Sequence, residues 1–218
     1  SRELAQITVS SRSIALLSQV FSSIKSVDLL KSREDATPYR ILNETGYELE
    51  VWIDRNDESN NNKTKIQNGE EIPWAFEDWR KIRENLDTDN KVDVLGLSLV
   101  GSNYDAIGGI SATSEGEEII MLYPPVNGVH NRLSCDIKLG EDNVKTIWLR
   151  STVVIDNDVD FPISIEMLSE NGNSSNKLTI PSNKKMALPI DSVYPDHLRI
   201  KPSIETPYSW SDNLVHWK

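Results

Sequence analysis

The sequence predicts an all-β protein made of two tandem β-sandwich-like repeats of about 110 residues, preceded by a short strand and an amphipathic helix. Three observations support this prediction. After Pro38 the chain consists of short alternating apolar runs separated by glycine, proline and asparagine turns, which is typical of sandwiches and barrels. One pattern of residues recurs at an offset of 114 positions. Residues 1–37 instead carry apolar side chains at helical spacing.

The lead-in comprises residues 1–37. Its first part, LAQITV, alternates like a short strand, and the segment after Ser13 presents one apolar helical face, formed by Ile14, Leu17, Phe21 and Ile24. A helix that packs this face on protein is the ordinary interpretation; a helix on a membrane surface is the alternative, which the few basic residues disfavour. The opening residues do not resemble a secretory leader, so we expect a fragment of a longer polypeptide.

The strands of the first repeat, residues 38–150, follow from alternation. ILNETGYELEVWI reads as one strand with Asn43 at its entrance. A polar loop, a short strand and an Asn68-Gly69 turn come next, and VDVLGLSLV is another strand. GSNYDAIGGISATSEGEE reads as a glycine-rich loop. Three further runs read as strands, the last of them long: IIMLYPP, RLSCDIKL and VKTIWLRSTVVI.

The second repeat, residues 151–218, is recognised by its correspondence with the first. Asn43 corresponds to Asn157 and Tyr47 to Phe161, and the register continues past a dissimilar polar loop to further apolar pairs, Ile66 with Ile180 and Ile72 with Met186. A register kept across such a loop indicates a tandem repeat. The counterpart of RLSCDIKLGEDNVKTIWL would fall after Lys218, so we expect the second repeat to be incomplete at its C-terminal end.

Asn43 and Asn157 stand at the same place in the two repeats. A short side chain with one acceptor and two donor hydrogens can bridge backbone groups of a neighbouring loop. The structural interpretation therefore makes each asparagine a staple of its own repeat. The alternative is that the two asparagines frame an edge that binds a partner.

The composition excludes several classes of function. A net charge of −11 disfavours nucleic acid and simple docking on anionic lipid. No catalytic motif, metal-ligand spacing or phosphate-binding loop occurs, so we expect neither an enzyme nor a cofactor nor a metal. Cys135 alternates with apolar residues and is expected in the core. A calcium site in DNDVD is the weaker alternative to solvated carboxylates.

Four stretches together resemble the repeats of the adaptor-binding region of VPS13 proteins, the bridge-like lipid-transfer proteins: PYRILNETGYELEVW, EEIPWAFEDWR, KTIWLRSTVVIDND and ALPIDSVYPDHLRIKP. The resemblance covers about residues 38–217. In that family each of about six β-rich repeats carries a hallmark asparagine, and Asn43 and Asn157 occupy those places. Ile72-Pro73 and Leu188-Pro189 resemble the apolar-proline step of the family but differ by two residues from the offset. With a helix before them, these look like the first two repeats.

The resemblance implies a non-enzymatic module that binds organelle adaptors carrying Pro-x-Pro motifs. Such binding recruits the lipid-transfer protein to contact sites at endosomes, vacuole or lysosome, mitochondria or the prospore membrane. It further implies a cytoplasmic, peripheral location, with lipid handled by other parts of the full-length protein and no membrane insertion by this segment. Four aromatic side chains are natural linings for a peptide pocket, namely Tyr47, Trp74, Trp79 and Phe161. For Tyr47 and Phe161 a place in the aromatic core is the favoured interpretation.

Two other interpretations stay open. The repeats can be an architectural spacer that positions other repeats, with the Pro-x-Pro site elsewhere. A secreted carbohydrate-binding or adhesive β-sandwich, glycosylated at Asn-x-Ser/Thr triplets, is the alternative from another class. The unpaired cysteine and the helical lead-in disfavour it.

Overall fold

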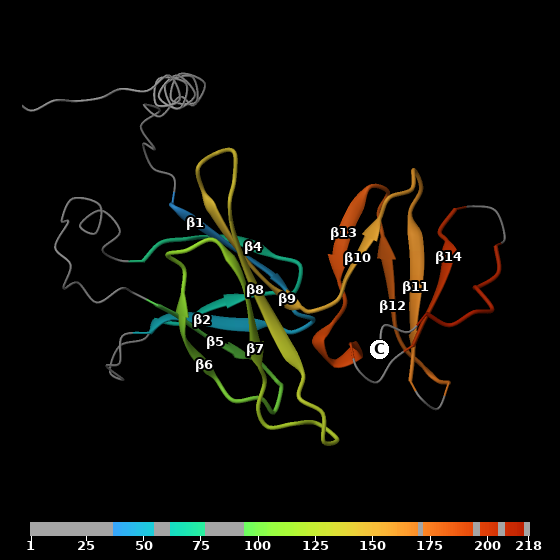
Figure 1. Ribbon diagram of the computed structural model, residues 1–218, viewed down its shortest axis with the longest axis horizontal. Coiled ribbons are helices and arrows are strands. Elements are labelled where there is room, and N and C mark those ends of the chain that lie inside the picture. The colour runs from blue at the N-terminus through green and yellow to red at the C-terminus, as the bar shows by residue number, and fades with distance from the viewer. Residues whose placement is uncertain are drawn as a thin grey trace, which may run out of the picture. The chain divides into compact units, whose positions relative to one another are not determined.

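The computed structural model describes residues 37–54, 62–76, 94–169, 172–193, 197–204 and 208–215 (Figure 1). The chain divides into two compact units, Ser1–Ala36 and Thr37–Lys218, and all described residues belong to the second. The predicted lead-in strand and helix lie outside the described residues. In the described ranges every element is a strand except one short 3-10 turn, η1 (Ile190–Ser192), which confirms the all-β class.

Nine strands form two sheets from the first part of the chain. The strands are β1 (Tyr39–Glu44), β2 (Leu49–Asp54), β3 (Thr64–Ile66), β4 (Glu71–Trp74), β5 (Val94–Leu99), β6 (Ile107–Ser111), β7 (Gly116–Met121), β8 (Arg132–Leu139) and β9 (Lys145–Ser151). One sheet has the order β4-β1-β9-β8-β7 and the other β3-β2-β5-β6. The β1–β9 pair is parallel and the other pairs are antiparallel.

Both of these sheets contribute to one hydrophobic core. Buried positions two residues apart, such as Leu49 with Val51 and Ile147 with Leu149, follow the period of two and pack in a single cluster. Of the four inward positions that the alternation of RLSCDIKL predicts, Leu133, Cys135 and Ile137 are among them, but the prediction is wrong for Leu139, which is 46% exposed at the end of β8. Side chains from two sheets that share one core make a sandwich-like arrangement.

Five further strands follow: β10 (Val154–Asn157), β11 (Ile163–Leu168), β12 (Ser174–Ile180), β13 (Lys184–Ala187) and β14 (His197–Pro202). They form a β10-β13 ladder and a β12-β11-β14 sheet. A second hydrophobic cluster lies among them, formed by Ile165, Met167, Ile180, Leu188, Val193 and Leu198. The exact division into residues 38–150 and 151–218 stays a prediction.

The strand pairing repeats at the offset seen in the sequence. Ile41 pairs with Ile72, and 114 residues later Ile155 pairs with Met186. In the same way the Leu49–Ile66 pair recurs as Ile163–Ile180. Because Met186 takes the place of Ile72, the Ile72-Pro73 and Leu188-Pro189 steps are not equivalent. Pro73 lies inside β4, whereas Pro189 directly precedes η1.

Three of the predicted elements were wrong in extent. Ile41–Ile53 is two strands, β1 and β2, because the chain turns at Gly46, where φ is +92°; Asn43 therefore lies near the end of a strand, not at the entrance of one. The long run after Val144 breaks after Ser151 into β9 and β10, which belong to different sheets. The glycine-rich run contains β6 and the start of β7, and the β5–β6 ladder has a register shift between Leu95 and Leu97, an irregularity that glycine in a strand often marks.

Candidate functional site

Asn43 is fully buried at the turn between β1 and β2. Its amide nitrogen donates to the carbonyl oxygens of Tyr47, at 2.8 Å, and of Ile66, at 3.0 Å. Its Oδ1 accepts from the backbone N–H of Thr45 at 3.1 Å and from the Thr45 hydroxyl at 2.8 Å. One side chain thus closes the turn and ties it to the end of β3.

Asn157 makes the corresponding contacts in the second part of the chain. Its amide nitrogen bonds the carbonyl oxygens of Phe161 at 3.0 Å, Ile180 at 3.1 Å and Pro181 at 2.8 Å, and its Oδ1 accepts from Val159 N at 3.3 Å. The side chain is 2% exposed. Both asparagines therefore have the arrangement that the staple interpretation requires, with their polar atoms directed at backbone within the chain.

The predicted pocket-lining residues are not gathered at one place in the described structure. Trp74 is buried in the first core against Phe76, with ring centroids 6.4 Å apart. Phe161 is 37% exposed near Asn157. Trp79 lies outside the described residues. Any contact of these side chains with an adaptor stays a prediction.

Tyr47 lies under the turn that carries η1. Its hydroxyl donates to Asp191, which also accepts from Tyr104 at 3.3 Å, and the two tyrosine rings meet edge to face. Burial, followed by the bond to Asp191, raises the pKa of Tyr47 above its usual value. The tyrosine is therefore committed to a contact within the chain.

The turn at η1 also reaches the first core. Ile190 is buried in the cluster of the first two sheets, and its N–H donates to the Thr45 carbonyl at 2.9 Å. A Cβ on Gly46 would lie only 2.7 Å from the Cβ of Pro189, so the turn fits against a glycine. Glu44 adds a carboxylate that accepts from the Ala187 N–H at 3.3 Å.

The unpaired edge of β7 is the best candidate for a binding site. Among the described residues β7 pairs only with β8. Leu122 N–H bonds the Asn131 carbonyl at 2.9 Å, and this register continues along the ladder. In an antiparallel pair, residues whose N–H and C=O groups bond the neighbouring strand alternate with residues whose groups point away from it. Leu122 is of the first kind, so Glu117, Ile119 and Met121 direct their N–H and C=O groups to the open edge.

The same strand carries an exposed apolar stripe. Ile119 and Met121 occupy alternate positions of β7 and are 55% and 43% exposed. Tyr123, in the bend after β7, is 52% exposed and donates its hydroxyl to Met121 Sδ. The following loop adds Val126 and Val129, which bridge each other and are also exposed. No other edge strand in the described ranges carries an exposed large apolar side chain. A long apolar edge of this kind is a template for another strand.

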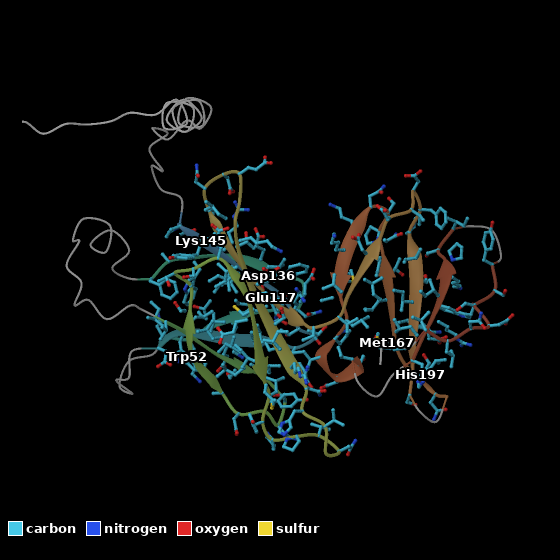
Figure 2. All side chains as sticks on the ribbon, in the orientation of Figure 1. Trp52, Glu117, Asp136, Lys145, Met167 and His197 are labelled. Atoms are coloured by element: carbon cyan, nitrogen blue, oxygen red, sulfur yellow. The ribbon has the colours of Figure 1, made fainter. Side chains whose placement is uncertain are left out.

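Glu117 and Asp136, which Figure 2 labels, belong to a polar network on the face of the sheet beside this stripe. The buried Arg150 guanidinium bonds Glu117 at 2.8 Å, lies 3.9 Å from Asp136 and stacks over Trp148 at 4.7 Å. Lys138 bonds Asp136 at 2.6 Å. The carboxylates of Glu117 and Asp136 are paired with these cations, while the buried Arg150 Nε has no hydrogen-bond partner among the described residues. The apolar stripe is therefore the part of this face left for a partner.

Sequence reasoning missed this edge. The run IIMLYPP predicts a strand, but only the sheet order reveals that the strand is terminal. The run itself carried no signal for this, because consecutive apolar residues are also the pattern of a strand buried on both faces.

The described residues hold no recognisable catalytic or metal centre. No group of three or more His, Cys, Asp or Glu side chains is placed there to hold a metal ion. None of the helices in the described ranges is long and apolar enough to cross a membrane.

Cys135 should be unreactive while the protein is folded. Burial, with the nearby Glu118 and Asp136 charges, raises the pKa of its thiol to about 12. We expect reaction with DTNB at pH 8 to be at least about tenfold slower in native protein than in guanidinium chloride, as absorbance at the thionitrobenzoate band would measure. Equal rates would contradict the core assignment.

Comparisons with known proteins agree with the geometry of an interaction module. Residues 78–218 match the family described as vacuolar-sorting associated protein 13, adaptor binding domain. The whole chain is 32% identical over 234 aligned residues to the intermembrane lipid transfer protein VPS13 of Chaetomium thermophilum. The alignment covers 100% of this chain but 7% of that protein, so the chain spans a small part of its relative.

Proposed function

The chain belongs to the VPS13 family, as part of its adaptor binding domain, and on this premise we propose that it binds adaptor proteins carrying Pro-x-Pro motifs at the open edge of β7. The single observation that carries the proposal is that β7 ends its sheet and that the same strand exposes the apolar side chains of Ile119 and Met121. Backbone bonds at such an edge supply affinity, and alternate side chains supply specificity.

The spacing of Pro-x-Pro suits this edge. Proline has no N–H, so it can occupy an added strand only where its nitrogen faces away from the sheet. Residues two apart face the same way in a strand. Both prolines can therefore point outward while the residue between them bonds Ile119 or a neighbour in β7. Their rings can also pack on Ile119 and Met121.

Charge sets the expected flanks of the peptide. The first half of β7 contains Glu117 and Glu118, and the chain as a whole has a net charge of −11. Basic residues beside the proline motif would be attracted to that half of the strand. Adaptor binding of this kind would recruit the full-length protein to contact sites at endosomes, vacuole or lysosome, or mitochondria, with lipid carried by its other parts.

Charged substitutions in the stripe test the proposal. In calorimetric titrations we expect a Pro-x-Pro peptide with basic flanks to bind at micromolar Kd, and the Ile119→Lys/Met121→Lys protein to bind it at least about 30-fold more weakly, through lost apolar contact. Both changes are on the solvent side of an edge strand, so stability should change by less than about 0.5 kcal/mol.

The matched control is Val159→Lys, which adds a lysine at an exposed apolar position far along the chain. This protein should bind the peptide like wild type. A peptide N-methylated at the residue between the prolines should fail to bind, because the bond to the edge is lost. Binding that survives the stripe variant would place the site elsewhere.

An architectural role is the second candidate, and a specific observation favours it. The turn of η1 buries Ile190 in the first core and bonds Tyr47 through Asp191, which couples the two parts of the chain closely. Well-folded protein that binds no Pro-x-Pro peptide would favour this spacer function over the adaptor site.

A further inference from the structure

A cluster of three cations lies on the outer face of the β12-β11-β14 sheet. The charged groups of Lys177, Arg199 and Lys201 lie 5.9, 5.3 and 4.8 Å from the ring centroid of Trp210. Lys177 comes from β12 and the other two from β14, so the cations approach the indole from both sides of β11. This cation–Trp210 cluster contrasts with the acidic balance of the whole chain.

One buried carboxylate lies between these cations. Glu166 on β11 pairs with Lys177 at 3.1 Å and with Arg199 Nε. Its partners, Arg199 first, lower the pKa of its carboxyl to about 2, so it stays ionised at neutral pH. Three cations against one carboxylate leave a local charge of about +2. Among the described residues no carboxylate lies within ion-pair distance of Lys201.

The equivalent face of the first part of the chain is electrically balanced, with two lysines against two glutamates. There Lys63 and Lys65 on or beside β3 pair with Glu50 at 3.2 Å and with Glu48 at 2.8 Å. Lys63 lies 5.0 Å from the ring of Trp52, which Figure 2 labels. The lysine–tryptophan contact recurs, but the excess positive charge belongs only to the second face.

We propose that the cation–Trp210 cluster is a docking site for an acidic peptide segment of a partner protein. Charge complementarity favours this occupant, because an extended carboxylate-rich segment can contact the cationic cluster without approaching the acidic remainder of the chain. An anionic membrane would bring a broad negative surface toward a chain of net charge −11, at distances near the Debye length of about 8–10 Å. Repulsion of the rest of the molecule therefore disfavours the membrane.

The donors for such a peptide are present on this face. Arg199 uses its Nε for Glu166, which leaves its terminal amino groups for a carboxylate. Lys201 lies opposite Ser164 in the ladder, and Ser164 lies opposite Thr179, so two hydroxyls share the face with the cations. Ion pairs beside an aromatic ring are strengthened by partial desolvation. The arrangement resembles an acidic-motif reader more than a solvated sheet face.

A paired substitution tests the site. The probe is a fluorescein-labelled peptide of alternating glutamate and serine, followed by anisotropy at low and at physiological salt. We expect saturable binding by the whole chain and about tenfold weaker binding by Lys177→Gln/Lys201→Gln. The matched control, Lys63→Gln/Lys65→Gln, removes the same charge from the equivalent face and should bind like wild type.

Each other outcome overturns the proposal. If both double variants bind the peptide equally more weakly, binding depends only on the net charge of the chain. If the wild-type chain does not bind the peptide, the cluster is not a docking site for it. Sedimentation with phosphatidylcholine vesicles containing phosphatidylserine distinguishes the other class of ligand. Vesicle binding that depends on Lys177 and Lys201, without peptide binding, would assign the cluster to lipid. Melting of each variant at the wild-type temperature confirms that it is folded.

Discussion

The Asn43→Ala protein is expected to unfold with a free energy lower by about 3 kcal/mol in its first part, at the upper end of the range for leaving buried groups unpaired. The substitution removes both donors to the Tyr47 and Ile66 carbonyls and the acceptor for Thr45. All of these groups lie at a buried or half-buried turn, where water replaces the lost bonds poorly. Urea unfolding followed by circular dichroism would measure the change.

Two controls separate hydrogen bonding from volume. Asn43→Asp keeps the size and the acceptor but aims a second oxygen at two carbonyl oxygens, so it should destabilise at least as much as alanine at pH 7. Asn103→Ala, at an exposed loop position, should change stability by less than about 0.5 kcal/mol.

Asn157→Ala should destabilise the second part of the chain, as Asn43→Ala destabilises the first, by about 1–3 kcal/mol. Unchanged unfolding of both buried variants would eliminate the staple interpretation.

Many of the strands could be predicted from the sequence because each repeat is recognisable from short, local residue patterns. Alternation marked most strands, and the offset that matched Asn43 with Asn157 also matched their hydrogen-bond partners, Tyr47 with Phe161 and Ile66 with Ile180. A residue whose contacts lie within its own repeat recurs with them. The pattern therefore carried information on contacts as well as on strands.

The contacts and exposure of several site residues could not be predicted, because they depend on pairing between segments that are distant in the sequence. Tyr47 and Phe161 occupy equivalent places, yet η1 covers only Tyr47, and nothing local to either residue distinguishes them. The aromatic residues that follow Trp74 favour a pocket lining, but β4 places its side chain in the core. The exposure of Ile119 likewise depends on which strand ends the sheet. Sheet order is non-local, so alternation alone does not reveal it.

The contact of η1 with the first core leads to the second large prediction. Ile190 belongs by sequence to the second repeat, but its side chain is buried among residues of the first two sheets. Ile190→Ala is expected to leave a cavity there and to destabilise the first part of the chain by about 3 kcal/mol. Hydrogen exchange by mass spectrometry should show lost protection in β1 and β2, more than a hundred residues away in sequence.

Val193→Ala is the matched control, because Val193 lies three residues further on and is equally buried, but in the second cluster. It should reduce protection in β11 and β12 and leave β1 and β2 unchanged. If Ile190→Ala instead affects only the second part, the two parts are energetically independent and the spacer function loses its physical basis. If it affects the first, the turn at η1 is the element through which one repeat fixes the orientation of the next, whichever partner β7 binds.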